Sequence, residues 1–233
     1  MSPPGSYRPP SMPLDKKVRS YYSLQMSKRE ATHDMILDRA LAMASAVGLE
    51  GLSIGGVARE AGLSKSGLFA HFQSKEDLQL QVLERAVERF IETVVAPALR
   101  RPRGEPRVRA LFDNWMAWED SDSMPGGCPF IAAATELDDR PGRLRDYLVS
   151  SQRDWLEALA TAARIAAKEG HFRRDLDAEQ FAYELYSIIL AFHHFHRLLR
   201  NPRSQERAKQ AFEDLIRQSR GDSPTAVHAA PAA

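Results

Sequence analysis

The stretch AGLSKSGLFAHFQSKEDL, residues 61–78, contains two helix start signals ten residues apart. Gly62 suits the residue just after one helix, and Ser64 suits the N-cap of the next, over residues 65–72. Ser74 then begins another helix in the manner of a capping box, with an aspartate three residues later. The pattern predicts a short helix held between two others. The interpretation of the fold and function of the chain starts from this arrangement.

Helical periodicity continues on both sides of this stretch. Apolar residues recur at spacings of three and four, and no run alternates as a strand would. The sequence therefore predicts an all-α protein. Helices are expected at residues 36–47, 53–61, 65–72, 75–97, 105–119, from 129 onward, at 143–170, 178–199 and 203–217.

Composition narrows the function only a little. The chain has 233 residues and a formal net charge of +1, so overall charge does not favour a nucleic-acid partner. The single cysteine, Cys128, excludes an intramolecular disulfide and a cysteine-based zinc site. The longest dense apolar stretch, residues 186–195, is too short to span a bilayer, and the N-terminus lacks the apolar core of a signal peptide. We expect a cytoplasmic protein with no membrane partner.

The pair of helices at 53–61 and 65–72 has the spacing of a helix-turn-helix unit, whose second helix enters the major groove of DNA. The apolar positions can pack inward, which leaves polar ones outside. Lys65 can reach a phosphate or a guanine edge, and Ser66 can bond a base or the backbone. A tight turn between two core helices remains an alternative. The exposed face is expected to hold Ser64, Lys65, Ser66, Gly67 and His71.

Lys75 lies at the start of the helix that follows, where free N–H groups favour an anion. We interpret it as a phosphate clamp. Gly67 has no side chain, so we expect DNA to approach the short helix closely there.

Residues 28–95 resemble the N-terminal domain of the TetR family of bacterial transcriptional regulators. The matching string runs from ILDRAL through GLEGLSIGGVAREAGLSKSGLFAHFQSKEDL, and S-K-x-x-L-[YF]-x-H-F-x-S-K-E is its most specific part. The resemblance implies a homodimer that reads a palindromic operator in double-stranded DNA. It also implies a larger helical C-terminal domain that binds a small-molecule effector and releases DNA, most often as a repressor. GGCPF, residues 126–130, is similar to one subgroup.

Two positions depart from the family pattern. Phe69 stands where tyrosine is usual, and we expect it to keep the packing while losing a phosphate donor. Gly55 replaces a residue that is often polar, so operator reading would depend more on Lys65, Ser66 and the N-terminal arm. Phe69 and Gly55 both belong to the expected DNA-binding surface. Ser53, at the start of the helix-turn-helix unit, belongs to it as well. Lys16, Lys17 and Arg19 either follow a DNA groove or form a solvated tail.

These features divide the chain into four parts. Residues 1–26 are expected to form a disordered arm, and residues 27–74 a three-helix DNA-binding domain with its motif at about 53–72. A long helix leads into a helical ligand-binding and dimerisation domain over residues 75–219. Residues 220–233 are expected to form a disordered tail.

The second half holds the expected ligand and dimer residues. Its helix at 178–199 is apolar nearly all round, so it is expected to be buried on several sides, and with the helix at 203–217 it suits a four-helix dimer interface. An ordinary core would use the same residue types as a ligand pocket. The expected dimer residues are Tyr183, Ile189, Phe192, Phe195, Phe212, Leu215 and Ile216. The expected ligand residues are Trp115, Trp118, Phe130, Tyr147, Trp155, Tyr186 and His193.

Metal and thiol chemistry are the remaining possibilities. His193 and His196 share a helix face but His194 does not, and no carboxylate or cysteine of that helix completes a ligand set. We expect hydrogen bonding there and no cofactor. Cys128 follows two glycines at a predicted helix start, so it is either a thiol sensor or a half-buried loop residue.

An enzyme or small-molecule carrier that uses the aromatic half directly is the main alternative to a regulator. The sequence shows no nucleophile–base–acid arrangement, so we predict that the protein is not an enzyme. A purely structural dimeric bundle would leave the closely spaced caps around Lys65 and Lys75 unexplained.

Overall fold

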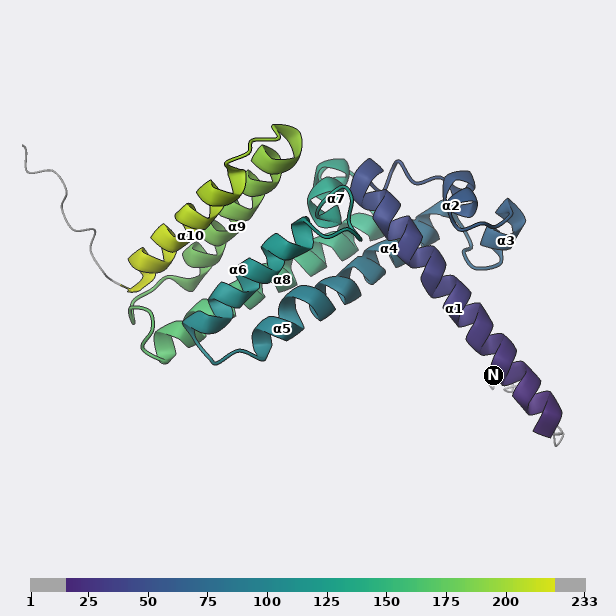
Figure 1. The fold of residues 1–233 in the computed structure, drawn as a ribbon, viewed down its shortest axis with the longest axis horizontal. Helices are drawn as coiled ribbons and strands as arrows, with labels where there is room; N and C mark the ends of the chain where they lie inside the picture. The colour runs from purple at the N-terminus through teal and green to yellow at the C-terminus, as the bar shows by residue number, and fades with distance from the viewer. Residues whose placement is uncertain (1–15, 221–233) are drawn as a thin grey trace, which may run out of the picture.

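The computed structural model describes residues 16–220, with side chains described from residue 28 onward. This described part is helical, with no strand in it, as the sequence predicts. Figure 1 shows an elongated molecule with α2 and α3 near one end, α9 and α10 at the other, and α1 projecting beyond the body. Within the described residues, no helix is long and apolar enough to cross a membrane.

The N-terminal unit consists of α1 and three helices that pack around its second half. Their hydrophobic residues form one end of a continuous core, which includes Ile36, Leu41, Val57, Leu68, Phe72, Leu78 and Val82. The unit therefore folds around the face that the periodicity predicts. Its helices are α1 (Lys16–Val47), α2 (Ile54–Glu60), α3 (Lys65–Phe69) and α4 (Lys75–Phe90).

The start of α1 corrects the expected arm. Residues 16–26, assigned from the sequence to a disordered segment, belong to this helix. No proline or glycine occurs between Pro13 and Gly48, so nothing in the chain interrupts the helix there. Residues 1–15 and 221–233 lie outside the described part, as do the side chains of Lys16, Lys17 and Arg19 on which the groove contact depends.

A nearly continuous helical run joins the two halves. After α4 the chain makes a π-helical turn, η1 (Ile91–Val95), and then α5 (Ala96–Leu99). Pro97 cannot donate a backbone hydrogen bond and crowds the carbonyl four residues earlier, which is consistent with a wider turn before it. Asn114 of the next helix donates to the Val94 carbonyl at 2.9 Å, so this turn is also held from outside.

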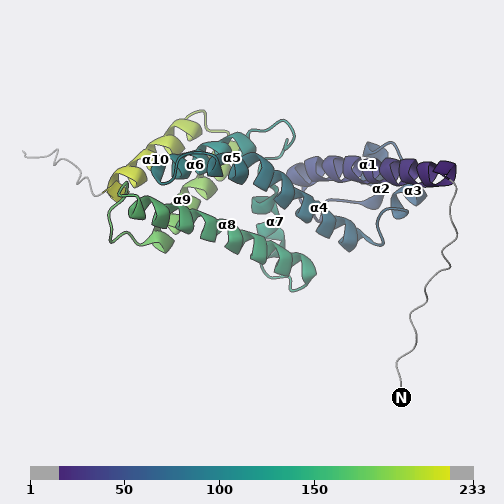
Figure 2. The ribbon, with the colours of Figure 1, turned by 90° about the horizontal axis from the view of Figure 1, so that it is seen from below.

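The C-terminal unit is a bundle of longer helices. Figure 2 shows α8 along one side and α6 with α10 along the other, with α9 between them. The predicted cap at Asp177 is confirmed here, because its side chain accepts a hydrogen bond from the Gln180 N–H at 3.0 Å at the start of α9. The elements are α6 (Glu105–Glu119), α7 (Pro129–Leu137), α8 (Arg143–Lys168), α9 (Ala178–His193), η2 (His194–Leu198) and α10 (Ser204–Arg220).

Glu136 of α7 clamps the C-terminal unit to the end of α1. Its carboxylate accepts from the backbone N–H groups of Leu49 and Glu50 at 2.9 and 3.2 Å. Gly48 makes room for it, because a Cβ added there would lie 1.7 Å from Glu136 Oε1. Gly48 also has a φ of +76°, a left-handed conformation that glycine adopts without strain.

A second link joins α1 to α4. Arg85 and Arg89 donate to the Asp38 carboxylate at 2.8 and 2.9 Å. Burial alone would raise the pKa of Asp38, but the two arginines outweigh it and leave that pKa below its usual value. The pair therefore holds the projecting helix to the helix that runs into the C-terminal unit.

Substitution of Gly48 tests the clamp. Gly48→Ala should lower the free energy of unfolding by about 2–3 kcal/mol, because it strains the backbone and displaces a carboxylate that accepts two hydrogen bonds. Gly62→Ala is the matched control: Gly62 has a φ of +70° but open space at the Cβ position. That control should cost only about 1 kcal/mol in urea unfolding. If both glycine substitutions lowered the free energy of unfolding equally, the clamp would be contradicted. It would also be contradicted if the difference between the two substitutions stayed the same in a Glu136→Ala background.

Candidate functional site

Two serine caps form the turn between α2 and α3. Ser53 accepts from the Gly56 N–H and Ser64 from the Gly67 N–H, each at 3.0 Å. Gly62 lies between the helices with its positive φ. The predicted helix-turn-helix geometry is therefore present, at the end of the molecule away from α9 and α10 (Figure 1).

The short helix α3 ends earlier than predicted. It ends at Phe69, since the His71 and Phe72 N–H groups both bond the Leu68 carbonyl and the chain turns inward there. Phe72 is buried by this turn. The predicted end at residue 72 is wrong because burial of Phe72 favours the turn over a further helical turn.

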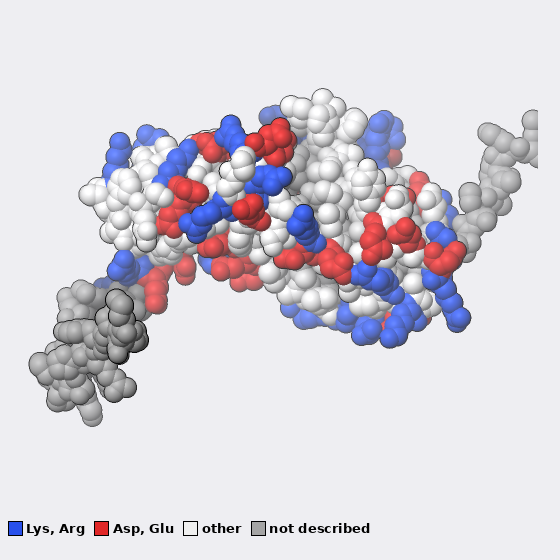
Figure 3. Space-filling view, turned by 180° about the vertical axis from the view of Figure 1, so that it is seen from behind, with Lys and Arg blue, Asp and Glu red and all other residues white. Residues whose placement is uncertain are grey.

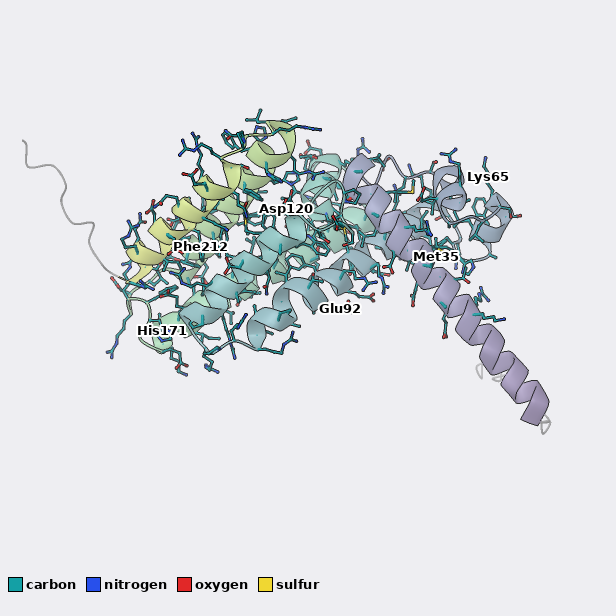
Figure 4. The ribbon with its side chains drawn as sticks, viewed as in Figure 1. Met35, Lys65, Glu92, Asp120, His171 and Phe212 are labelled. Atoms are coloured by element: carbon teal, nitrogen blue, oxygen red, sulfur yellow. The ribbon has the colours of Figure 1, made fainter. Side chains whose placement is uncertain are left out.

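The exposed side chains of α3 are those of Lys65, Ser66 and Phe69. Figure 4 shows Lys65 beside the short helices α2 and α3, far from His171 and Phe212. Phe69 is 53% exposed, so it packs against the chain over only part of its surface. The inward anchors are Leu68, within α3, and Phe72, just after its end, and both are buried.

Two glycines of the motif make room for neighbouring side chains, which the sequence alone did not predict. A Cβ on Gly55 would lie 2.9 Å from Lys65 Cε, so Gly55 makes room for the Lys65 side chain. At Gly67 a Cβ would face Ser64 and Leu63 rather than open space. Gly67 therefore permits the close serine cap, and the close approach of DNA expected there stays a prediction.

His71 and Lys75 both contact other parts of the chain. The ring of His71 lies 5.7 Å from that of His33 on α1, and its burial, together with the charges of His33 and Arg29, lowers its pKa. Lys75 Nζ donates to the Glu50 carbonyl at 2.8 Å. His71 thus turns towards α1 and away from the exposed face, whereas Lys75 remains partly exposed beside the start of α4.

Charge on the rest of the surface is mixed. Figure 3 shows acidic and basic side chains interspersed over one face of the molecule. A contact with DNA would therefore depend on local groups such as Lys65 and not on a broad field of one sign.

An apolar cavity of about 190 Å³ lies between the α4–η1 run and the helices of the C-terminal unit. Four of the expected ligand residues line it, namely Trp115, Phe130, Trp155 and Tyr186. It is also lined by residues that the sequence did not single out for this role, including Phe90, Ile91, Val95, Cys128, Ile131, Gln152, Ala158 and Ile189.

Three expected ligand residues are not part of this lining. Trp118 packs edge-on behind Phe90, with ring centroids 5.6 Å apart. His193 is hydrogen-bonded to Glu119. Tyr147 belongs to α8 but lies outside the cavity wall, and aromatic character alone could not separate these positions from the lining.

Polar groups around the cavity are few. Tyr186 donates its hydroxyl to Gln152 Oε1 at 2.8 Å, and burial raises the pKa of Tyr186 to about 12. Trp155 Nε1 is buried without a hydrogen-bond partner among the described residues. Asp154 is exposed at the edge. The cavity thus suits an apolar ligand, with a buried indole N–H on one of its lining residues.

Glu119 is a fully buried carboxylate that the sequence did not identify. It accepts from the Cys128 N–H at 2.9 Å, and its other oxygen lies 2.8 Å from His193 Nδ1. Gly127 provides the space for it, because a Cβ there would lie 2.4 Å from Glu119 Oε1. In the sequence, only the glycines before Cys128 could have indicated a buried group nearby. Glu119 itself resembles an ordinary glutamate at the end of a helix.

The three clustered histidines have separate surroundings. His196 lies 2.8 Å from Asp120 and stacks on Phe192, while His193 pairs with Glu119. His194 is exposed. Among the residues that the structure describes, no group of three potential ligands could hold a metal ion.

The expected dimer residues fall into two groups. Tyr183 and Phe195 are 68% and 39% exposed. The other five are covered by the chain's own helices, so assigning them to a surface that a second copy could bury is wrong. An amphipathic pattern marks a buried face but not which helix covers it. These five are Ile189, Phe192, Phe212, Leu215 and Ile216, of which Phe212 stacks on Phe112 with ring centroids 4.1 Å apart.

Two family models match most of the folded chain. Residues 36–82 match the model described as "Bacterial regulatory proteins, tetR family", and residues 104–212 match "Tetracyclin repressor-like, C-terminal domain". Together they cover the α2–α3 motif and the cavity lining apart from Val87, Phe90, Ile91 and Val95. None of the curated proteins matches the sequence significantly.

Solved structures share the fold at low sequence identity. A TetR transcriptional regulator from Chloroflexus aurantiacus J-10-FL is 24% identical, with a TM-score of 0.73 over 82% of this chain and 94% of that one. A TetR-family regulator from Cytophaga hutchinsonii is 18% identical, with a TM-score of 0.70 over 89% and 98%. AibR, solved with isovaleryl coenzyme A and operator DNA, is 20% identical, with a TM-score of 0.62 over 80% and 97%.

The environment of Cys128 predicts an unreactive thiol. Its burial, with the charge of Glu119, raises its pKa to about 12, so almost no thiolate forms at pH 8. Iodoacetamide should label the native protein at least about a thousandfold more slowly than the same chain in urea. Because Cys128 is the only cysteine, mass spectrometry reports this site alone. Comparable labelling rates in both states would instead support the thiol sensor.

Proposed function

Because this chain belongs to the TetR family of bacterial regulatory proteins, we propose that it is a DNA-binding transcriptional repressor that a small ligand releases. It would bind a palindromic operator as a homodimer, in the cytoplasm. One observation carries the proposal: the run from α4 through η1 begins beside the exposed helix α3 and ends in the wall of the apolar cavity.

Exposure and chemistry of α3 support the DNA contact. Lys65, Ser66 and Phe69 are exposed on a short helix held by two serine caps. In a helix-turn-helix unit the residues near the start of the second helix reach the base edges. AibR, which shares the fold, has been solved with operator DNA. We assign base reading to Lys65 and Ser66, and a phosphate contact to Lys75 once it leaves the Glu50 carbonyl.

The cavity supports a small, mainly apolar or aromatic effector. Its lining is dominated by aromatic and aliphatic side chains, and Trp155 brings an unpaired indole N–H. A ligand with a hydrogen-bond acceptor on an apolar body would fit this chemistry, because a buried donor without a partner is costly. The cavity volume of about 190 Å³ favours a compact molecule.

The coupling we propose runs through α4. Phe90, Ile91 and Val95 line the cavity, while Leu78 and Val82 of the same helical run pack with the DNA-binding unit. A ligand that displaces the cavity end would move α3. In a dimer this changes the spacing of the two recognition helices from about 34–36 Å, one helical turn of DNA.

Exposed apolar residues near the far end support dimerisation. Tyr183 and Phe195 are joined by others on the outer side of α9 and η2, and such a concentration is typical of a protein interface. We therefore place the dimer surface on Tyr183, Leu190, Phe195, Leu198 and Leu199.

Selection of binding sites from a random duplex pool tests the proposal. At fixed, near-physiological salt the purified protein should enrich a palindrome whose half-sites lie about one helical turn apart. Ligand binding without enrichment of any DNA sequence would favour a small-molecule carrier that uses the cavity directly. That outcome would overturn the regulator.

The two lysines should differ in their effect on the selected operator. Lys75→Ala should weaken binding to all duplexes and reduce the salt slope by about one, because one phosphate contact is lost. Lys65→Ala should instead relax the preference at one base position by about 1–3 kcal/mol. Fluorescence anisotropy over a salt series measures both effects, with Lys209→Ala on α10 as the control. Equal losses on all sequences for both lysines would contradict the division of roles.

Filling the cavity should separate ligand response from DNA binding. Ala158→Phe places a ring in the lining, so a ligand that releases the wild-type operator complex should no longer do so. Operator affinity without ligand should stay within about threefold of wild type. Ala158→Ser is the size control and should keep the response. Retained release by the Phe variant would place the ligand elsewhere.

A further inference from the structure

Phe69 is an exposed aromatic residue that folding does not explain. Its side chain is 53% exposed, whereas Leu68 and Phe72 beside it are buried and anchor α3 to the core. Leaving a phenyl ring in water forgoes the stabilisation that burial would give. The ring is therefore free to make a contact outside the chain.

Its position places that contact on the helix face that carries Lys65 and Ser66. Phe69 follows them by four and three residues, the spacings that put side chains on one side of a helix. The Lys65 side chain extends from this face over Gly55 of α2. Phe69 occupies the next turn of α3, further along the same surface.

The chemistry of the major groove limits what a phenyl ring can recognise there. Base edges in that groove present hydrogen-bond donors and acceptors, and the C5-methyl group of thymine is their apolar feature. Phosphates are charged and hydrated, so they offer Phe69 no comparable contact. Phe69 has no donor or acceptor with which to read any other group.

We propose that Phe69 determines operator sequence by packing against a thymine C5-methyl group. This assignment rests on the proposed function, since it requires α3 to lie in the major groove. Burying one methyl group corresponds to about a fourfold change in affinity, so the symmetric pair in a palindrome gives about fifteenfold. Lys65 and Ser66 then read polar edges beside it.

Replacing thymine by deoxyuridine removes only this methyl group and tests the contact directly. With the operator selected from the random pool, uracil at one symmetric pair of positions should weaken wild-type binding about fifteenfold, measured by anisotropy at fixed salt. Phe69→Ala should bind the thymine and uracil operators equally well at that pair. Phe69→Leu, which keeps an apolar side chain, should retain part of the discrimination.

Leu99→Ala is the matched control, because Leu99 is also an exposed apolar residue but lies on α5 away from α3. It should leave the thymine preference unchanged. Operator binding that no uracil substitution weakens, or discrimination that survives in Phe69→Ala, would overturn the role of Phe69 alone. Failure of the wild-type protein to bind any duplex selectively would overturn the proposed function and this assignment with it.

Discussion

The packing of Phe90 at the end of α4 is the interaction on which the rest of the structure depends. Its ring meets Trp155, Trp118 and Phe130 edge-on, with centroids 4.9, 5.6 and 5.8 Å away. The same helix starts at the Ser74 cap, next to α3. Since a helix is stiff over this length, fixing Phe90 in the aromatic cluster also fixes the direction in which the DNA-binding unit projects.

The local features of the fold could be predicted from the sequence because caps and glycines act over a few residues. Ser53, Ser64, Ser74 and Asp177 all cap helices, and α6 has the expected bounds. Burial could be predicted only as a property of a helix face. The pattern of α9 could not show that Ile189 lines a cavity whereas Tyr183 is exposed, because that depends on which distant helix covers each side.

The role of Gly55, beside α3, also could not be predicted from the local sequence. From the sequence, Gly55 was interpreted as a lost side-chain contact. In the structure its missing Cβ leaves the space that Lys65 Cε occupies. The loss of one side chain thus sets the position of another ten residues later. No local rule predicts such a pairing, since it depends on the angle at which α2 and α3 meet.

Glu119 provides a second connection between the cavity and the DNA-binding unit. Its carboxylate accepts a hydrogen bond from the Cys128 N–H, and Cys128 both lines the cavity and immediately precedes α7. At the other end of this nine-residue helix Glu136 accepts the hydrogen bonds of Leu49 and Glu50. A buried carboxylate left without its partners is costly, so Glu119 resists any shift of the α7 start. Under the proposed function, a ligand beside Cys128 would therefore act on two rigid elements, α4 and α7, and both end at the unit that carries α3.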